Sequence, residues 1–476
     1  MKGEVTSEIT LGSATLQLAV LRSGAMRVTE LAEAHLARIE RLNPRLNVFA
    51  DFDAERVREQ ARTLEAAEEP YGALHGLPVT VKSSIATAGY RCEIGSLLNK
   101  GEIAREDAEV VARLRAAGAL ILGTTNCPEF LMAYETANLL HGRTSNPWDL
   151  ERTPGGSSGG ESAAIAAGLS AAGLGSDSGG SVRVPAHFTG ICSLKPTPGR
   201  VPGRGHLPSC VGPFATLGAI GPMARTIEDV AMLFAVLSGQ DMSDPVSPPV
   251  ALRRRSLDEL RANAIGYFED DGIAPVTAET RAAVQAAAQA LREAGFRVEP
   301  FRPQTLERLR KLWTIFFVQC GAMFYEPAIR GRREQLSPIF MEFLGMAEAV
   351  GPLTAVELLN AWAELDLLRG KTLEAMRDYP VLLCPVASIP AWKHGEREWN
   401  VEGERVKYLD AVRYTQWFNA LACPVAVVPV GRSEKGSGEG LPIGVQIAAR
   451  PFEDELVLGI AGIVDRAFGY RPPPLA

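Results

Sequence analysis

The stretch TPGGSSGGESAAIAAGLSAAGLGSDSGGSVRVPAHFTGICSLKPTPGR, residues 153–200, is the part of the sequence that most strongly indicates fold and function. Two serines in it, Ser157 and Ser181, each follow a pair of glycines, and an alanine-rich segment predicted to be a helix separates them. Glycine permits positive φ angles and lets several backbone N–H groups converge on one point. A flexible Gly/Ser linker is the simpler interpretation, but these glycines are not repetitive and flank a helix of the buried type. The stretch therefore predicts two ordered loops.

The second loop has the composition of an oxyanion hole. In the run Asp177-Ser178-Gly179-Gly180-Ser181, the glycines allow several N–H donors to point at one acyl oxygen as it becomes negative. Each such donor commonly lowers a reaction barrier by ~3 kcal/mol. A serine at the end of the run is placed to attack the same acyl carbon. The residues indicate acyl transfer by a nucleophilic serine, with Ser157 and Ser181 as the two candidates.

A serine nucleophile needs a base, and two residues are candidates. His187, one of six histidines, lies near Ser181 in the sequence, although a packed polar residue is the interpretation that we favour. Lys82 follows the apolar run LPVTV, so we expect it at the end of a strand, partly desolvated. Burial lowers the pKa of a lysine toward neutrality and makes its amine a usable base. A lysine at a strand end is usually a surface charge, so the residues alone leave both candidates open.

Strand and helix patterns alternate along the chain. Residues 10–67 have helical spacing of apolar residues, and a helical pattern at 108–117 lies between short buried runs at 77–85 and 119–122. Further short apolar runs occur at residues 381–385, 425–429 and 444–448. The alternation predicts an α/β fold, a sheet wrapped by helices. Because no Pro/Gly-rich tether divides the chain, we expect one large domain at 1–476.

Two segments carry more specific expectations. The helix that contains residues 31–42 should stop at Asn43-Pro44, because proline cannot continue a helix. Residues 306–346 are helical and aromatic, and such helices are expected to wall an apolar substrate channel, although core packing explains each ring singly as well. The aromatic residues are Trp313, Phe316, Phe317, Phe324, Tyr325, Phe340 and Phe343. Further candidates to border the acyl pocket, in the loop after Arg200, are Ser209, Cys210 and Phe214.

Composition and charge exclude several classes of protein. The net charge of −7 and the pI of about 5.6 provide no basic field for nucleic acid or an anionic membrane. The seven cysteines are scattered without a CxxC pair, which argues against a disulfide scaffold or zinc ribbon and favours a reducing compartment. No apolar stretch reaches the ~20 residues that span a bilayer. We expect a cytoplasmic enzyme, monomeric or homodimeric, without nucleic-acid or membrane partners.

Taken in order, the motifs resemble those of the amidase signature family of serine hydrolases, and the likeness covers nearly the whole chain. Besides residues 153–200, the matching segments are GLPVTVKSS (76–84), GTTNCPEF (123–130), SNPWD (145–149), GPMARTIEDVA (221–231), NALACPVAVVPVG (419–431) and LPIGVQIAARPFEDE (441–455). A match this long and ordered is far more specific than a lone glycine-rich loop. The resemblance implies the amidase signature fold, one domain with a central mixed, twisted β-sheet flanked by many helices. Within it we expect N-terminal helices at 1–70, the core with the catalytic residues at 71–235 and the aromatic substrate-channel segment at 300–350.

The resemblance also implies a Ser–cis-Ser–Lys triad, with Ser181 as nucleophile, Ser157 as proton relay and Lys82 as base. The Gly156–Ser157 peptide bond is then expected to be cis. The implied oxyanion hole consists of the N–H groups of Ser178, Gly179, Gly180 and Ser181, and the implied supporting residues are Ser158, Asp177 and Arg183. Such a route forms a covalent acyl-enzyme and needs no metal or cofactor. The implied substrates are small-molecule amides, with aryl amides, carbamates (urethanes) and esters as further candidates.

Two departures from the family pattern leave alternatives open. Ser83 stands where the family often has aspartate, and Thr124 replaces the lysine of the family's GKTN turn. Both weaken the likeness to the A-type chain of glutamyl-tRNA(Gln) amidotransferase, which releases ammonia from glutamine beside a partner chain. A Gly-x-Ser-x-Gly elbow with Ser157 as nucleophile and a later histidine as base is a second alternative. A phosphate-cradling loop is a third, although no Gly-Lys-Ser/Thr ending follows the glycines.

Overall fold

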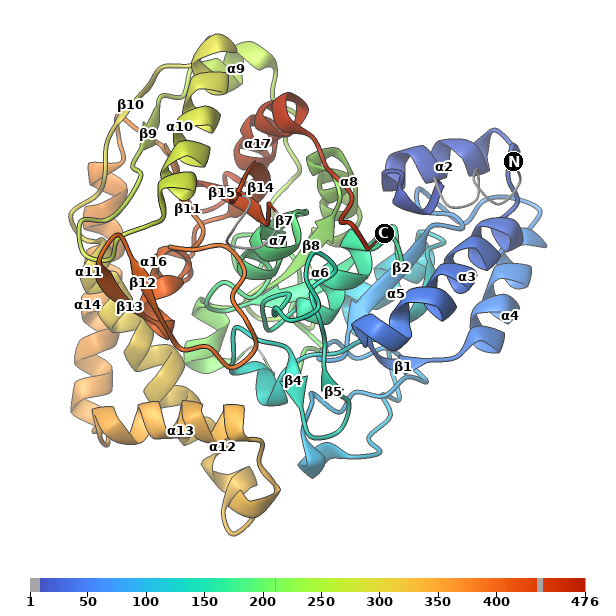
Figure 1. Cartoon of the computed structure of the whole chain (residues 1–476), viewed down its shortest axis with the longest axis horizontal. Coiled ribbons are helices and arrows are strands. Elements are labelled where there is room, and N and C mark those ends of the chain that lie inside the picture. The colour runs from blue at the N-terminus through green and yellow to red at the C-terminus, as the bar shows by residue number, and fades with distance from the viewer. Residues whose placement is uncertain (1–8, 210, 435–439, 476) are drawn as a thin grey trace.

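The centre of the molecule is one mixed β-sheet. The computed structural model describes residues 9–209, 211–434 and 440–475. The sheet strands are β1 (Phe49–Phe52), β2 (Pro78–Lys82), β3 (Leu120–Thr125), β6 (Ala172–Asp177), β7 (Cys192–Lys195), β8 (Ala219–Ala224), β9 (Ile265–Tyr267), β10 (Val298–Pro300), β11 (Val381–Pro385), β14 (Val425–Arg432) and β15 (Pro442–Ala449). Their order is β1-β3-β2-β6-β8-β7-β14-β15-β11-β9-β10 (Figure 1). β2 runs parallel to β3 and β6, whereas the five pairings from β6 across to β11 are antiparallel.

Helices cover both faces of this sheet. They are α2 (Ala14–Arg22), α3 (Val28–Leu46), α4 (Ala54–Glu65), α5 (Glu109–Ala116), α6 (Gly159–Ala166), α7 (Arg183–Thr189), α8 (Ile227–Leu237), α9 (Leu257–Arg261), α10 (Ala278–Glu293), α11 (Leu306–Trp313), α12 (Cys320–Ile329), α13 (Pro338–Val350), α14 (Ala355–Ala375), α15 (Tyr408–Ala411), α16 (Arg413–Ala420) and α17 (Asp454–Phe468). Ala426 and Val428 of β14 pack in one core with α8, α10 and α17, and Val427 packs in another with α6 and α7. Alternate side chains of a strand point to opposite faces, so the two cores lie on opposite sides of the sheet.

The observed architecture confirms the predicted fold class, a single α/β domain with a large mixed sheet flanked by helices. In Figure 1, α2, α3 and α4 lie at one end of the molecule and α11 to α14 at the other. Two short hairpins stand apart from the main sheet, β4 (Ala137–Asn138) with β5 (Gly142–Arg143) and β12 (Glu398–Val401) with β13 (Glu404–Lys407).

One prediction of a helix boundary is wrong. Pro44 lies inside α3, which continues to Leu46 and ends where Asn47 adopts a left-handed conformation (φ 53°). In this last turn the proline removes only one backbone hydrogen bond, and the Asn47 N–H closes the helix on the Asn43 oxygen (2.7 Å). Residues 306–346 are mostly helical, as predicted. They comprise α11, a π-helical turn η4 (Thr314–Gln319), α12, a short 3-10 turn η5 (Arg333–Gln335) and part of α13, and Ser337 starts α13 by accepting a hydrogen bond from the Phe340 N–H.

Within the described part of the chain, no single helix has both the length and the apolar character needed to cross a bilayer. The consecutive helices α13 and α14 satisfy that criterion only when they are taken together, and they are bent by 97° relative to each other.

Candidate active site

The two glycine–serine loops come together beside the end of β2. The first loop leads into α6, and the second connects β6 to α7. A β-carbon added to Gly156 would lie 2.5 Å from the Glu135 carbonyl oxygen, and Gly180 has φ 128°, so both positions require glycine. The Gly156–Ser157 peptide bond is cis, as the resemblance implies. Both loops are buried and ordered, which excludes the flexible-linker interpretation.

Lys82 is the last residue of β2, as its place after the apolar run predicts, and it is fully buried, whereas the sequence predicts partial desolvation. Its Nζ donates hydrogen bonds to Ser157 Oγ (2.7 Å) and Ser176 Oγ (3.1 Å). Burial lowers the pKa of Lys82 to about 8, against partial compensation from neighbouring Cys127 and Asp177. The lowered pKa makes the neutral amine, which can accept a proton, far more accessible than for a lysine in water.

Ser181 and Ser157 line the same cavity, although they come from different loops. The Ser158 N–H donates to the Ser181 carbonyl oxygen (3.2 Å), which ties the loops together. The Ser158 hydroxyl donates to the Ser176 oxygen and accepts from the Ser176 N–H, both at 3.3 Å. Of the sequence-predicted residues, Ser157 and Ser181 thus border one small space, and Lys82 lies behind Ser157, to which it is hydrogen-bonded.

The four N–H groups predicted for the oxyanion hole are not equivalent. Gly180 N–H donates to Asp177 Oδ1 (2.8 Å), so this group is already engaged. The N–H groups of Ser178, Gly179 and Ser181 have no hydrogen-bond acceptor among the residues that the structure describes. Three of the four groups are therefore available to bind a developing oxyanion.

Asp177 and Arg183 form a buried ion pair under the second loop. Arg183 Nη2 donates to Asp177 Oδ1 (2.9 Å) and Nε to Oδ2 (3.0 Å), and both side chains are completely excluded from solvent. Burial by itself raises the pKa of Asp177, but the Arg183 guanidinium and the Asn419 amide override it and hold that pKa well below its usual range. The carboxylate is therefore charged, and it also fixes the loop through the N–H groups of Gly180 and Val182.

A second buried acid, which the sequence analysis did not identify, lies on the same face of β2 as Lys82. Glu161, one turn after Ser157, accepts hydrogen bonds from Thr80 and from Thr125 (2.8 Å). Burial raises the pKa of Glu161 to about 8. Ser83, which replaces the aspartate common in the family, instead contacts the Cys127 sulfur (3.3 Å).

Two small cavities of about 30 Å³ each meet at Ser181. Leu131, Met132 and Phe317 belong to both. Leu131 and the preceding Phe130 adopt left-handed φ angles of 68° and 51°, a strained arrangement that often occurs at functional sites. Among the described residues, those that line the cavities include no aspartate, glutamate, lysine or arginine. The space beside Ser181 is therefore narrow and mostly apolar.

Some of the predicted channel residues reach this space and others do not. Trp313, Phe317 and Phe343 line the second cavity, together with Met346 and Tyr408. The other four aromatic residues of the segment pack elsewhere: Phe316, Phe324, Tyr325 and Phe340. In the loop after Arg200, the residues at the cavity are His206 and Pro208. Cys210 lies outside the described residues, and so does the Phe214 side chain.

His187 is engaged away from Ser181. Its Nδ1 accepts from the Gly444 N–H (2.8 Å), and its Nε2 contacts the Ile389 carbonyl oxygen (3.1 Å). His206 does line the cavity, with Nε2 3.3 Å from Ser84 Oγ. Burial lowers the pKa of both imidazoles to about 4. Within the described chain, no group of three or more His, Cys, Asp or Glu side chains is arranged to hold a metal ion.

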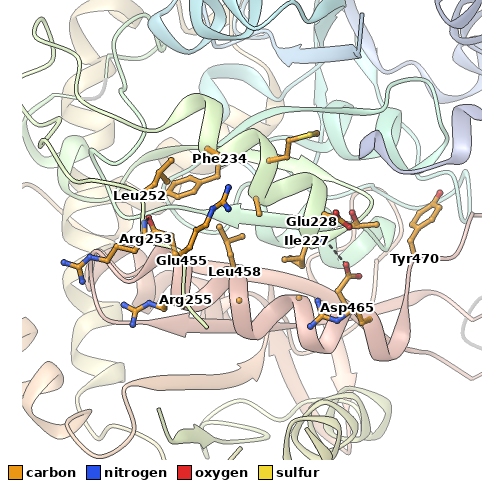
Figure 2. A pocket seen from close by; sticks show the side chains of 18 of the residues that line it. Ile227, Glu228, Phe234, Leu252, Arg253, Arg255, Glu455, Leu458, Asp465 and Tyr470 are labelled. Atoms are coloured by element: carbon orange, nitrogen blue, oxygen red, sulfur yellow. Dashed lines mark hydrogen bonds between the residues drawn. The ribbon is translucent and has the colours of Figure 1, made fainter. Parts of the chain in front are cut away.

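A larger groove of about 1000 Å³ lies between α8 and α17 and contains none of the sequence-predicted site residues. Figure 2 shows Ile227, Phe234 and Leu458 in this groove, with Arg253 and Arg255 beside them. The groove presents apolar surface and charge, but its described lining residues include neither serine nor lysine.

Comparison with known proteins identifies the family. A sequence model of the family described as Amidase matches residues 30–458. The chain belongs to the amidase family. It is 34% identical over 469 residues to an indoleacetamide hydrolase of Bradyrhizobium diazoefficiens, with 96% of this chain and 86% of the relative covered. It is also 34% identical to the A-type chain of a glutamyl-tRNA(Gln) amidotransferase of Symbiobacterium thermophilum, with 92% of this chain and 93% of the relative covered.

A solved structure of a 6-aminohexanoate cyclic dimer hydrolase complexed with substrate has the same fold, with a TM-score of 0.84, 28% identity and coverage of 98% of this chain and 99% of the other. These relatives, with the family match, establish an amidase-family hydrolase of C–N bonds.

Proposed function

We propose that this amidase cleaves its substrate through Ser181 as nucleophile, Ser157 as proton relay and Lys82 as base. The single observation that carries the proposal is the buried 2.7 Å hydrogen bond from Lys82 Nζ to Ser157 Oγ, beside the cavity that Ser157 shares with Ser181. A lysine with a pKa lowered to about 8 supplies a neutral amine at the point where a serine hydroxyl needs a base.

The steps follow from these positions. Neutral Lys82 accepts the Ser157 proton while Ser157 accepts the Ser181 proton, and Ser181 Oγ forms a bond to the acyl carbon. When the tetrahedral intermediate collapses, the C–N bond breaks and the leaving nitrogen receives the proton through Ser157, which leaves Lys82 neutral. Water then attacks the acyl-enzyme by the same relay, releasing the carboxylic acid and restoring Ser181.

Developing charge on the acyl oxygen would be stabilised by the N–H groups of Ser178, Gly179 and Ser181. Each is without an acceptor within the described chain, whereas the Gly180 N–H is engaged by Asp177. Asp177, Arg183 and Ser158 support the loop and do not contact the reacting atoms in this scheme. Mutational loss of one oxyanion-hole donor typically costs ~10²–10³ in rate, so three donors suffice for efficient catalysis.

The cavity favours neutral amides with a small or flat apolar acyl group. Leu131, Phe317 and Phe343 provide apolar walls, and the described lining residues carry no charged side chain that would bind an ionised substrate. The relatives named an indoleacetamide hydrolase and an acylamidase support this substrate class. Aryl amides, carbamates and esters of such acyl groups belong to the same proposed substrate class.

The ammonia-releasing chain of an amidotransferase is the second candidate, because the relative of that kind is equally similar in sequence. Glutamine carries an ammonium and a carboxylate, and a site that selects it needs charged partners for both groups. The apolar lining favours the stand-alone amidase. Glutaminase activity that appears only with a co-purifying partner chain would establish the second candidate instead.

Labelling with a fluorophosphonate tests the proposed function. We expect a single adduct on Ser181, located by peptide mapping, and no label on Ser181→Ala. Label on Ser157 in the wild-type protein would support the Gly-x-Ser-x-Gly elbow and refute the proposed roles. A panel of aryl acetamides, p-nitroanilides, short aliphatic amides, carbamates and glutamine then identifies the substrate.

A further inference from the structure

Three side chains from outside the glycine–serine stretch hold the carbonyl groups of the second loop. Trp313 Nε1 donates to the Ser178 oxygen (2.8 Å). Tyr134 Oη (2.8 Å) and Thr415 Oγ1 (2.5 Å) both donate to the Gly179 oxygen. Trp313, Tyr134 and Thr415 are all buried, so water competes little for these bonds.

The carbonyl direction determines the direction of the next N–H group. The Ser178–Gly179 peptide bond is trans, because the cis bonds of the described chain are at Gly156–Ser157 and Leu207–Pro208. In a planar trans peptide the C=O and N–H groups point in opposite directions. The Trp313 bond to the Ser178 oxygen therefore fixes the direction of the Gly179 N–H, one of the three unengaged donors.

The two bonds to the Gly179 oxygen act on a different peptide. They fix the direction of the Gly180 N–H, which donates to Asp177 and faces no substrate. The Gly179–Gly180 peptide is held at both ends, since its carbonyl oxygen accepts two hydrogen bonds and its N–H donates one. Among the described side chains, Trp313 alone holds the Ser178–Gly179 peptide. The loss of Trp313 should therefore disturb the oxyanion hole more than the loss of either hydroxyl.

Trp313 also belongs to the wall of the substrate cavity. It ends α11, and its ring stacks on Phe317 in the π-helical turn η4, with centroids 4.7 Å apart and an interplanar angle of 13°. Both rings line the second cavity beside Ser181. A β-carbon on Gly179 would lie 2.7 Å from Trp313 Cζ2, so the indole packs directly on the loop.

We infer that Trp313 is a positioning residue, which aims the Gly179 N–H at the oxyanion and joins the wall of the substrate cavity to the second loop. The inference rests on the proposed function, because it assumes that the acyl oxygen faces this loop. It assigns a role in the reaction to a residue of the helical segment, far from the serines in sequence.

The test replaces Trp313 by phenylalanine and measures two quantities. These are kcat and KM for the best amide of the panel, and the second-order rate of Ser181 labelling by a fluorophosphonate, whose phosphoryl oxygen occupies the oxyanion hole. We expect Trp313→Phe to lower kcat and the labelling rate about tenfold, less than the ~10²–10³ of a lost donor, because the N–H remains but is no longer held. KM should stay within about twofold, since an aromatic ring still fills the wall.

Phe316→Leu is the matched control, because Phe316 is a buried ring of the same π-helical turn that packs against Trp362 and lines neither cavity. It should leave both KM and the labelling rate within about twofold of wild type. Should Trp313→Phe fail to fold, incorporation of 3-benzothienylalanine at position 313 keeps the bicyclic shape and removes only the N–H.

A folded Trp313 variant with wild-type kcat and labelling rate would overturn the inference, and so would an equal loss of labelling in Phe316→Leu. Failure of the proposed function is recognised separately, because wild-type Ser181 would then not be labelled at all.

Discussion

The glycine–serine loops and the aromatic helical segment border the same cavity, but they are built in opposite ways. In and around the loops, charged side chains such as Lys82 at the end of β2, Asp177 and Arg183 are fully buried and hydrogen-bonded to one another, to serine hydroxyls or to the backbone. In the segment, Trp313, Phe317 and Phe343 meet the cavity mainly through rings. Buried polar networks tolerate little change because each unpaired group costs free energy, whereas apolar walls tolerate changes of shape.

This difference teaches where chemistry and selectivity reside. Substitutions in the loops should act on kcat or on folding, because they remove a proton acceptor or leave a buried charge unpaired. Substitutions in the aromatic segment should act on KM and on the choice of acyl group. Trp313 is the exception, because its indole N–H belongs to the wall and yet holds the loop.

The largest effect should come from Lys82→Met. Methionine retains most of the buried volume but cannot accept the Ser157 proton, so kcat should fall by at least ~10³. Initial rates with the best amide of the panel measure this change. Near wild-type turnover in a folded Lys82→Met protein would exclude lysine as the base.

Lys195→Met provides the matched control for that experiment. Lys195 is also fully buried with a pKa lowered to about 8 by burial, but its Nζ donates to the Pro196 oxygen (3.0 Å) and not to a serine. It should retain turnover within about threefold of wild type. An equal loss in both variants would attribute the effect to removal of a buried charge and not to a base.

Arg183→Met should produce the next largest effect, and on stability. It leaves the Asp177 carboxylate buried without its ion-pair partner, which typically costs about 3–5 kcal/mol. Urea unfolding followed by tryptophan fluorescence gives the free energy of unfolding. The control is Arg330→Met in the aromatic segment, where the pair with Glu326 is exposed and worth about 0.5 kcal/mol or less. Similar losses in the two variants would refute the contrast between the regions.

Local sequence was sufficient to predict the first elements of the site. The apolar run before Lys82 predicted a strand with a partly desolvated lysine at its end, and the glycine pairs predicted ordered loops at Ser157 and Ser181. These features depend on neighbours within a few residues, where hydrophobic pattern and glycine geometry decide the structure. The resemblance to the family predicted that Lys82, Ser157 and Ser181 form one site, which the local pattern of each residue could not predict.

Long-range contacts could not be predicted in this way. The bond between Trp313 and Ser178 joins residues 135 positions apart, and nothing near Trp313 distinguishes it from a ring in the core. The engagement of the Gly180 N–H by Asp177 depends on how the loop closes, not on its composition. Pro44 shows a related limit, since a proline stops a helix only where the lost hydrogen bond is not compensated by a cap such as Asn47.

The pH dependence of the rate should show a moderate effect, caused by the lysine that contacts the first loop. Because the active form has neutral Lys82 and its pKa is about 8, kcat/KM should rise about tenfold per pH unit below pH 8 and level off above it. Protonation of Lys82 at lower pH removes the base, so kcat/KM falls as the pH falls. Glu161 titrates in the same range, since burial raises its pKa to about 8. Glu161→Gln should therefore keep this acidic limb, and its disappearance in that variant would assign the limb to Glu161.

The smallest effect should come from Phe343→Leu, which changes the cavity wall and none of the polar network. Phe343 lines the second cavity and meets Phe317 edge-on, with centroids 6.2 Å apart, so a smaller side chain gives more room to the acyl group. We expect the ratio of kcat/KM values for a bulky and a small acyl group to rise about three- to tenfold, because a few methylene-sized contacts are worth about 1 kcal/mol. Phe340→Leu is the matched control: it belongs to the same aromatic cluster, stacks on Phe343 and does not line the cavity. Phe340→Leu should lower stability and leave the ratio of kcat/KM values unchanged. An equal shift of that ratio in both variants would show that the segment acts through packing and not as the wall that selects the acyl group.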